Sequence, residues 1–531
     1  MHWLDCPPLR YESHYGDRVV LCFSDRPASV DHILREAVDS KPDNVAIIDG
    51  VRRFTYLEFD QEVNKIAMGL AAHGLGLGDR VAILLNNSAE FAFIFFAIMR
   101  IGAVAVPLST REQKPELGFA LGNCGAKMII YEAILVDRLP DPDSIPELRH
   151  RISLNGTEVD SKLFSTLSKL DDVPVVVVPQ ESPAVILYTS GTTGKPKGAV
   201  LTQMSIVISA MHYETCWNLN SNDRALMAVP ATHVTGLVAI MLAMVRVKGS
   251  MITLRVFKAA MFLDLAEKER MTYTLMVPAM YHLCLLQTDI SGYDLSSWRV
   301  GGYGGSPMPV ATIKTLAEKL PNLHLVNAYG STETTSPSTL TPLGEGAVKS
   351  DTVGLPVPCC KICIMDDDGC EVSVGSVGEI WIKGGHVASG YWNNTDATQL
   401  NFVSGFWRSG DIGALREDGY LQIFDRKKDM INRGGFKVYS AEVEDVLAYH
   451  PKVGEAAVIG DPDPVLMEKV HAYILPSDNS LTEEDIKSYC ASRLSDFKVP
   501  DFITFVNQPL PRNANGKILK RALKKESMDV I

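Results

Sequence analysis

The stretch from Tyr188 to Gly198 has the composition of a phosphate-binding loop. Its eleven residues, YTSGTTGKPKG, include three glycines, four aliphatic hydroxyls and two lysines, and no acidic residue. Glycine lets backbone N–H groups approach phosphate oxygens, and hydroxyls and ammonium groups add donors and charge. A polar surface loop is the alternative, but so many donors in one short run favour an anion cradle. The residues expected to form it are Thr189, Ser190, Gly191, Thr192, Thr193, Gly194, Lys195 and Lys197.

This loop is not a Walker A motif. That motif requires a glycine five positions before Gly194 and a serine or threonine directly after Lys195. The sequence has Thr189 and Pro196 at those two positions. The Walker A pattern therefore fails twice.

A second stretch, Asn327 to Thr334, places an aromatic ring, a hydroxyl and a carboxylate within five residues. It directly follows the apolar run Leu323 to Val326. A carboxylate such as Glu333 can hold a magnesium ion that neutralises phosphate charge. The same residues could instead form a turn followed by a helix N-cap.

Three shorter stretches offer further groups for a nucleotide. Gly301 to Met308 has room for a flat ring to lie on bare backbone, and Asp411 could accept hydrogen bonds from both ribose hydroxyls. An Asx turn is the commoner use of such an Asp. Near the C-terminus, the Asn-x-Asn-Gly-Lys turn could present Lys517, although a solvated basic tail is the alternative.

The length and charge of the chain limit what it can be. At 531 residues it is too long for one core, so two or more domains are expected. Its 46% apolar and 21% charged residues are ordinary for a globular protein. A net charge of −12 argues against a nucleic-acid partner, because phosphate backbones select basic faces.

Cysteine usage and the N-terminal sequence favour a reducing cytoplasm. The polar and aromatic residues from Met1 to Arg18 do not resemble a secretory leader. Cys359, Cys360, Cys363 and Cys370 suggest zinc, but Cys360 and Cys363 would point to opposite faces of a predicted strand. The apolar run Phe91 to Val106 is too short for a transmembrane segment and predicts a buried helix followed by a strand.

Alternating helical and strand-like segments must position these groups. Between residues 28 and about 180, helices at Val30–Val38 and Tyr56–His73 alternate with strands at Val45–Ile48 and Val81–Leu85, which indicates parallel strands covered by helices. The segment Pro140 to Val173 is interpreted as a subdomain join. The alternation resumes from Ala184 to Leu340, with strands at Ala225–Val229, Ser250–Leu254 and Tyr273–Val277.

The last third of the chain has a different pattern. Short strands and Gly-rich turns from Thr352 to Asp425 predict a small antiparallel β unit, and about 100 further residues have an alternation of their own. That tail is expected to contain helices at Ala441–Ala448 and Thr482–Leu494 and strands at Ala456–Ile459 and Val470–Ile474. The charged run Asp425 to Asp429 between the two regions is a candidate hinge.

Together and in this order, the stretches resemble the motifs of the adenylate-forming superfamily, which includes acyl- and aryl-CoA synthetases, firefly-type luciferases and peptide-synthetase adenylation domains. The resemblance implies an α/β fold whose large N-terminal domain, residues 1–427, has two parallel-sheet α/β subdomains and a small β-barrel-like subdomain at about 352–425. A small mobile α+β C-terminal domain, residues 428–531, would follow, with its hinge at Lys428. The phosphate loop would span residues 188–198.

The same resemblance implies a role for each site residue. Glu333 would hold Mg2+, Thr332 would contact phosphate, Lys517 would reach into the site during adenylation, and His233 would gate the acyl pocket. Arg426 would support the ribose or the α-phosphate, beside the ribose ligand Asp411. The remaining nucleotide contacts would come from Gly304, Gly305, Ser306, Asn327, Ala328, Tyr329 and Gly330, and the CoA step would use Gly434, Gly435 and Lys437.

Two departures from the family pattern stand out. Ser440 occupies a position where many relatives have proline, an exchange that we expect to matter little. Leu466-Met467-Glu468 stands where relatives usually have a Gly-Glu pair, which puts the contacts made there in doubt.

The expected activity is an ATP-dependent carboxylic acid:CoA ligase that forms an acyl-AMP, releases pyrophosphate and passes the acyl group to the CoA thiol. By the same resemblance, the stretches Gly302–Gly305 and Ala328–Ser336 would line the acyl pocket. They are built mostly from small residues without lysine or arginine, so a mainly apolar monocarboxylic acid, medium-chain or aromatic, is expected. The alternatives are an adenylation enzyme that loads a carrier protein and a non-catalytic nucleotide-binding homologue, and luciferase-type oxidation stays open. A homodimer is also left open.

Overall fold

The chain divides into two compact units that exchange segments. One comprises Met1–Ile362 and Ile382–Arg408, and the other comprises Cys363–Trp381 and Ser409–Ile531. The computed structural model describes residue 3 and residues 6–154, 162–163, 176–189, 196–478, 480–512, 518–520 and 522–524. Lys428 lies inside the second unit, and the domain boundary expected there stays a prediction.

The first sheet of unit 1 has seven strands in the order β11-β10-β6-β5-β7-β8-β9. All neighbours pair in parallel except β10 and β11, which form an antiparallel hairpin. The strands are β5 (Arg80–Leu84), β6 (Val104–Pro107), β7 (Met128–Glu132), β8 (His150–Leu154), β9 (Lys162–Leu163), β10 (Pro183–Thr189) and β11 (Lys197–Thr202).

The second sheet of unit 1 has nine strands in the order β18-β17-β16-β15-β14-β12-β13-β3-β4. Its six central strands, from β16 to β3, are parallel. The strands are β3 (Val45–Asp49), β4 (Arg52–Thr55), β12 (Arg224–Met227), β13 (Ser250–Thr253), β14 (Tyr273–Met276), β15 (Val300–Gly304), β16 (His324–Tyr329), β17 (Thr339–Leu340) and β18 (Leu355–Pro356).

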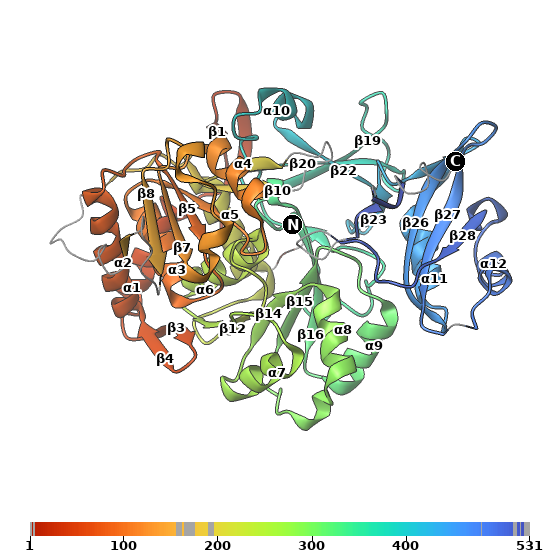
Figure 1. The fold of residues 1–531 in the computed structure, drawn as a ribbon, viewed down its shortest axis with the longest axis horizontal. Coiled ribbons are helices and arrows are strands. Elements are labelled where there is room, and N and C mark those ends of the chain that lie inside the picture. The colour runs from red at the N-terminus through yellow and green to blue at the C-terminus, as the bar shows by residue number, and fades with distance from the viewer. Residues whose placement is uncertain are drawn as a thin grey trace. The chain divides into compact units, whose positions relative to one another are not determined.

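Helices connect these parallel strands, as Figure 1 shows in orange to green. Each begins where the sequence supplies a cap or an apolar face. Thr55 caps α2 through a capping box with Glu58, and every residue of α3, in the predicted apolar run, is buried except Glu90. The main helices are α1 (Val30–Ser40), α2 (Tyr56–Ala72), α3 (Ala89–Arg100), α4 (Lys114–Cys124), α5 (Gln203–Trp217), α7 (Ala259–Lys268), α8 (Pro278–Gln287) and α9 (Val310–Lys319).

Unit 2 has its own sheet and helices, drawn in blue in Figure 1. Its sheet order is β25-β24-β27-β26, with β28 beside β27, and α11 and α12 pack on a separate apolar core. The elements are β23 (Leu421–Arg426), β24 (Ile431–Arg433), β25 (Phe436–Val438), α11 (Ser440–Ala448), β26 (Val453–Asp463), β27 (Met467–Pro476), α12 (Glu483–Ala491) and β28 (Phe502–Phe505). Three strands run through the joins between the units: β19 (Cys360–Met365), β20 (Gly378–Gly384) and β22 (Phe406–Leu415).

The predicted fold class is confirmed: α/β with parallel sheets, followed by a C-terminal part with its own sheet and helices. Alternating helices and strands had indicated this arrangement, and the observed bounds differ by only a few residues at most ends. In the part of the chain that the structure describes, we find no helix with the length and apolarity needed to cross a membrane.

Candidate active site

The base of the predicted phosphate loop is a closed hairpin. Thr189 at the end of β10 pairs with Lys197 at the start of β11, and the Thr189 hydroxyl donates to the Lys197 carbonyl over 3.4 Å. A cavity of about 330 Å³ lies beside it, lined by Phe119, Asn123, Pro196, Lys197, Gly198, Trp392 and Asn394. The loop residues Ser190 to Lys195 lie outside the described residues, so their contact with phosphate stays a prediction.

The carboxyl ends of β15 and β16 supply bare backbone. Gly304 pairs with Ala328, and a Cβ on Gly304 would lie 2.3 Å from the Ala328 carbonyl oxygen, so only glycine fits. Gly305 follows with φ of +82°, which turns the chain into an exposed bend at Ser306. Ligands of α/β sheets bind at the carboxyl ends of parallel strands, and a flat ring could rest here.

Asn327 and the residues after it continue this edge. Asn327 pairs with Tyr303 on the neighbouring strand β15, and Tyr329 ends β16. A Cβ on Gly330 would lie 3.1 Å from the Pro337 Cα, so a small residue is needed where the chain turns. The predicted adenine-binding residues are thus adjacent in the structure, although their ligand stays a prediction.

Glu333 lies in a short 3-10 turn, Thr332–Thr334, with Ser331 at its N-cap. Its side chain is buried with the residue only 7% exposed, and both carboxylate oxygens accept hydrogen bonds. The Ser331 hydroxyl donates to Oε2, and the Tyr391 hydroxyl donates to Oε1 over 2.8 Å. The carboxylate is therefore held in one orientation.

The backbone after this turn is strained. Thr335 and Ser336 have φ values of +53° and +42°, a region that side chains disfavour and β-branched residues most of all. Such conformations persist only where the surroundings enforce them, and they cluster at functional sites. The strain supports a functional role for the Glu333 turn.

Tyr391 is a site residue that the sequence did not reveal. It contacts Glu333 through its hydroxyl, and the Lys197 ammonium lies over its ring, 5.1 Å from the centroid. It is 58 positions from Glu333 and falls in no phosphate or nucleotide motif. Its position a few residues after Gly384-Gly385 is a sequence feature that could have suggested a site residue, but such a feature is only a weak indication.

His233 precedes a π-helix, Thr235–Leu242, whose sequence TGLVAIML has no charged residue. The His233 Nδ1 accepts from the Thr235 amide over 3.3 Å, which leaves Nε2 as the protonated nitrogen of the neutral ring. Burial lowers the pKa of His233, so the ring is uncharged at neutral pH. π-helical turns are frequent at functional sites.

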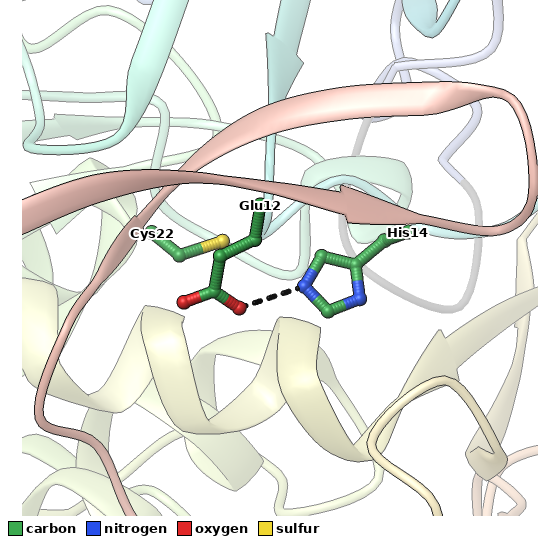
Figure 2. A group of neighbouring side chains, drawn as sticks. All are labelled: Glu12, His14 and Cys22. Carbon is green, nitrogen blue, oxygen red and sulfur yellow. Dashed lines mark hydrogen bonds and ion pairs between the residues drawn. The ribbon is translucent and has the colours of Figure 1, made fainter.

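The groups beside Glu333 fit a magnesium ion. The carboxylate and the hydroxyls of Ser331 and Thr332 are hard oxygen donors, and Mg2+ typically takes one or two carboxylates together with substrate phosphates. A second group of possible ligands, Glu12, His14 and Cys22, is shown in Figure 2. It fits a metal poorly, because Arg26 pairs with Glu12 at 2.7 Å and holds the pKa of that carboxyl far below its usual range.

In unit 2, Asp411 lies opposite Arg426 on the β22–β23 hairpin. The residue is 6% exposed, and its Oδ1 lies 3.1 Å from the Arg426 Nε. The two residues predicted to serve the ribose are therefore neighbours. Neither is placed here against the Glu333 turn, so their shared ligand stays a prediction.

The predicted hinge and CoA residues lie on turns of unit 2. Lys428 is exposed in the turn after β23. Gly434 and Gly435 connect β24 to β25 with φ of +59° and +92°, as a two-residue hairpin turn requires. The Lys437 side chain is 58% exposed. Lys517 lies outside the described residues, so its position is not part of this geometry.

Ser440 makes contacts that the expectation of a minor role did not foresee. Its backbone N–H and its hydroxyl both donate to the Asp425 carboxylate, in a buried contact. The Lys520 ammonium donates to the Ser440 hydroxyl over 2.7 Å and pairs with Glu444 over 2.7 Å. Proline has no N–H, so a relative with proline cannot make the first of these bonds.

The second departure also has a structural consequence. Met467 has φ of +68°, a conformation that glycine adopts freely and other residues rarely do. Glu468 keeps a defined partner, because its Oε2 accepts from the Asn432 amide over 2.7 Å. The exchange therefore leaves the turn intact and places a strained, exposed side chain on it.

Two family models match the chain over most of its length. Residues 34–392 match the model of the AMP-binding enzyme family, and residues 442–517 match the AMP-binding enzyme C-terminal domain. A long-chain-fatty-acid–CoA ligase, FadD13 of Mycobacterium tuberculosis, is 35% identical over 479 residues, covering 89% of this chain and 93% of that protein. A feruloyl-CoA synthase of an Amycolatopsis species is 33% identical over 484 residues, covering 90% and 95%.

A solved structure supports the fold. The anthranilate CoA ligase AuaEII in complex with anthranoyl-AMP superposes with a TM-score of 0.87, covering 96% of this chain and 99% of that one. The two sequences are 24% identical, so this likeness concerns the fold alone.

Proposed function

The chain belongs to the AMP-binding enzyme family and is an AMP-forming acid–thiol ligase, and we propose that its acid substrate is a mainly apolar monocarboxylate, medium-chain or aromatic. Acyl- or aryl-CoA ligation through an acyl-AMP is the activity of this class, with ATP and CoA as co-substrates. The identity of the acid is more specific than this general activity, and it is the part that we propose.

The π-helix after His233 carries this proposal. Its eight residues bring no charge, and the neutral His233 ring brings none either. A second carboxylate buried here would lack a cation, which costs several kcal/mol. Fatty and aromatic acids appear in the names of the relatives, which supports both subclasses.

Gly302, in one of the stretches predicted to line the acyl pocket, does not border open space. A Cβ on Gly302 would lie 3.0 Å from both the Leu275 side chain and the Trp217 ring. The protein's own side chains therefore fill the space beside Gly302. The size limit for the acid is set elsewhere, and the helix after His233 is the candidate.

A substrate comparison tests the proposal. kcat/KM for pyrophosphate release is measured with octanoate, a cinnamate, acetate and malonate, each with and without CoA. Octanoate or cinnamate should exceed malonate by at least about a hundredfold and acetate by at least about tenfold. Malonate or acetate as the best acid would contradict it.

We assign Glu333, Thr332, Thr189 and Lys197 to the ATP phosphates and Asp411 and Arg426 to the ribose. Glu333 would hold Mg2+, which when bound would neutralise phosphate charge. In this assignment the chain's own groups would orient the phosphates. The same assignment gives Lys517 to the adenylation step, and Gly434, Gly435 and Lys437 to the thioester step, with Lys428 as the pivot.

A pair of variants tests this division between the two steps. Lys517→Ala should abolish acyl-AMP formation and spare CoA capture of a supplied acyl-AMP. Gly435→Ala, which strains a turn at φ of +92°, should do the reverse. Gly369→Ala is the matched control, because Gly369 also has positive φ, +80°, and open space around it. Equal losses in both half-reactions would contradict the division.

A further inference from the structure

The Glu333 carboxylate depends on a distant residue for its orientation. Ser331, its neighbour in the turn, donates to Oε2, and Tyr391 donates to Oε1 over 2.8 Å. A phenol is protonated at neutral pH, so the Tyr391 hydroxyl acts as the donor in this contact.

Tyr391 is itself fixed from several sides. It forms a β-bridge with Ala199 of β11, and its N–H donates to the Thr398 hydroxyl over 2.9 Å. Phe402 packs against the ring in a T-shaped contact with centroids 5.5 Å apart. Because β11 is the strand that leaves the predicted phosphate loop, the ring is anchored to the base of that loop.

The same ring also contacts a cation. The Lys197 ammonium lies 5.1 Å from the ring centroid, within the range of a cation–π interaction. One aromatic side chain thus contacts the carboxylate through its hydroxyl and the ammonium through its face. The Glu333 turn has a second contact with the segment that carries Tyr391. The Ala388 N–H, three residues before Tyr391, donates to the Glu333 carbonyl over 2.8 Å.

We propose that Tyr391 is a positioning residue for adenylation, which orients the Glu333 carboxylate and the Lys197 ammonium toward the phosphates of the nucleotide. The inference rests on the proposed function, in which Glu333 faces the metal and Lys197 faces phosphate. The two hydrogen bonds occupy one lone pair on each carboxylate oxygen and leave the second lone pair of each for a cation. Partners that orient a metal ligand in this way typically contribute ten- to a hundredfold in metal affinity or activity.

Tyr391→Phe isolates the hydroxyl, because phenylalanine keeps the ring under Lys197. Mn2+ serves as the probe, and its dissociation constant in the presence of ATP is measured by electron paramagnetic resonance. We expect it to rise about tenfold, with kcat for acyl-AMP formation reduced similarly and KM for the acid unchanged. CoA capture of a supplied acyl-AMP should not change.

Tyr56→Phe is the matched control. Tyr56 is fully buried and donates to the Gly249 carbonyl over 2.7 Å, so its loss weakens the fold in a comparable way. It should leave Mn2+ affinity unchanged. An effect of equal size in both variants would reduce Tyr391 to a structural role and overturn the proposal.

Other outcomes separate this inference from the proposed function. If Glu333→Gln weakens Mn2+ binding and Tyr391→Phe does not, the positioning role is wrong and the site assignment stands. If neither changes Mn2+ binding, the site assignment itself is wrong. Should Tyr391→Phe fail to fold, Thr398→Val decides, because it frees the Tyr391 backbone and should shift the same readouts by a smaller factor. Unchanged Mn2+ affinity and unchanged acyl-AMP formation in Thr398→Val would overturn the proposal.

Discussion

The Glu333 turn and the Gly434-Gly435 turn are built in opposite ways. Glu333 is 7% exposed, and both its carboxylate oxygens accept hydrogen bonds. Beside the glycine turn, Phe436 is 58% exposed, and so is the side chain of Lys437. One turn holds a charge in a fixed place, and the other leaves its side chains in solvent.

This difference matches the roles proposed for the two turns, the Glu333 turn in adenylation and the glycine turn in the thioester step. Phosphoryl chemistry gains most from charges that are fixed before the reaction begins, whereas a turn that admits a long thiol-bearing arm needs backbone that a ligand can approach closely. The residues with strained backbone near the two turns show the same contrast. Thr335 is buried, whereas Met467 is 61% exposed.

The largest expected effect concerns the fixed turn. Glu333→Gln keeps the shape and the Tyr391 bond and removes the charge, so acyl-AMP formation should fall at least about a hundredfold. Pyrophosphate release measures it, and CoA capture of a supplied acyl-AMP should persist. Glu318→Gln, at an exposed residue of α9, is the control. Rates within twofold of the parent would erase the contrast between the turns.

The next effect concerns unit 2, where Ser440, the first residue of α11, donates two hydrogen bonds to Asp425. Ser440→Pro removes two donors to a buried carboxylate, and each such bond contributes about 1.5–3 kcal/mol. Hydrogen exchange of residues 440–448, followed by mass spectrometry, should accelerate strongly. Ser440→Ala keeps the N–H and should show a smaller change. Equal exchange in all three proteins would show that the contact does not stabilise the helix.

A smaller effect should appear on acidification in unit 1. His386 lies fully buried against His212, with ring centroids 5.2 Å apart, and burial lowers the pKa of His386 to about 3. Below the unfolded pKa of about 6.5 the unfolded chain binds a proton that the folded chain does not, so stability falls as pH falls.

Comparison with His386→Gln isolates this contribution. Between pH 7.0 and 5.5 the parent should lose about 1 kcal/mol more stability than the variant, as measured by urea midpoints at the two pH values. His282→Gln serves as a control at another histidine. Parallel losses in parent and His386→Gln would mean that the ring is protonated inside the fold.

The smallest effect concerns the exposed strain. Met467→Gly relieves the backbone strain of a φ of +68°. It should stabilise unit 2 by a net of about 0.5–1 kcal/mol, once the conformational entropy that glycine adds to the unfolded chain has been subtracted. Val465→Gly, at a residue 84% exposed without positive φ, should not stabilise. A destabilised Met467→Gly would mean that the side chain makes a useful contact.

Much of the fold was predictable from local sequence. Apolar periodicity located the helices and strands of the parallel sheets, because each side chain's burial follows from its own position in a helix or strand. The Glu333 and Gly304 stretches were also predictable as site candidates, since their residue types suit phosphate and a flat ring. The roles of Tyr391 and Ser440 were not, because each depends on partners far along the chain.

The sequence by itself determined the element order, the composition of the phosphate loop and the carboxylate available for a metal, since these depend on neighbouring residues. Only the tertiary structure decided which hydroxyl reaches Glu333, that one ring contacts both Glu333 and Lys197, and that Trp217 fills the space beside Gly302. Such contacts join segments whose separation in sequence carries no information about their distance in space, so packing alone decides them.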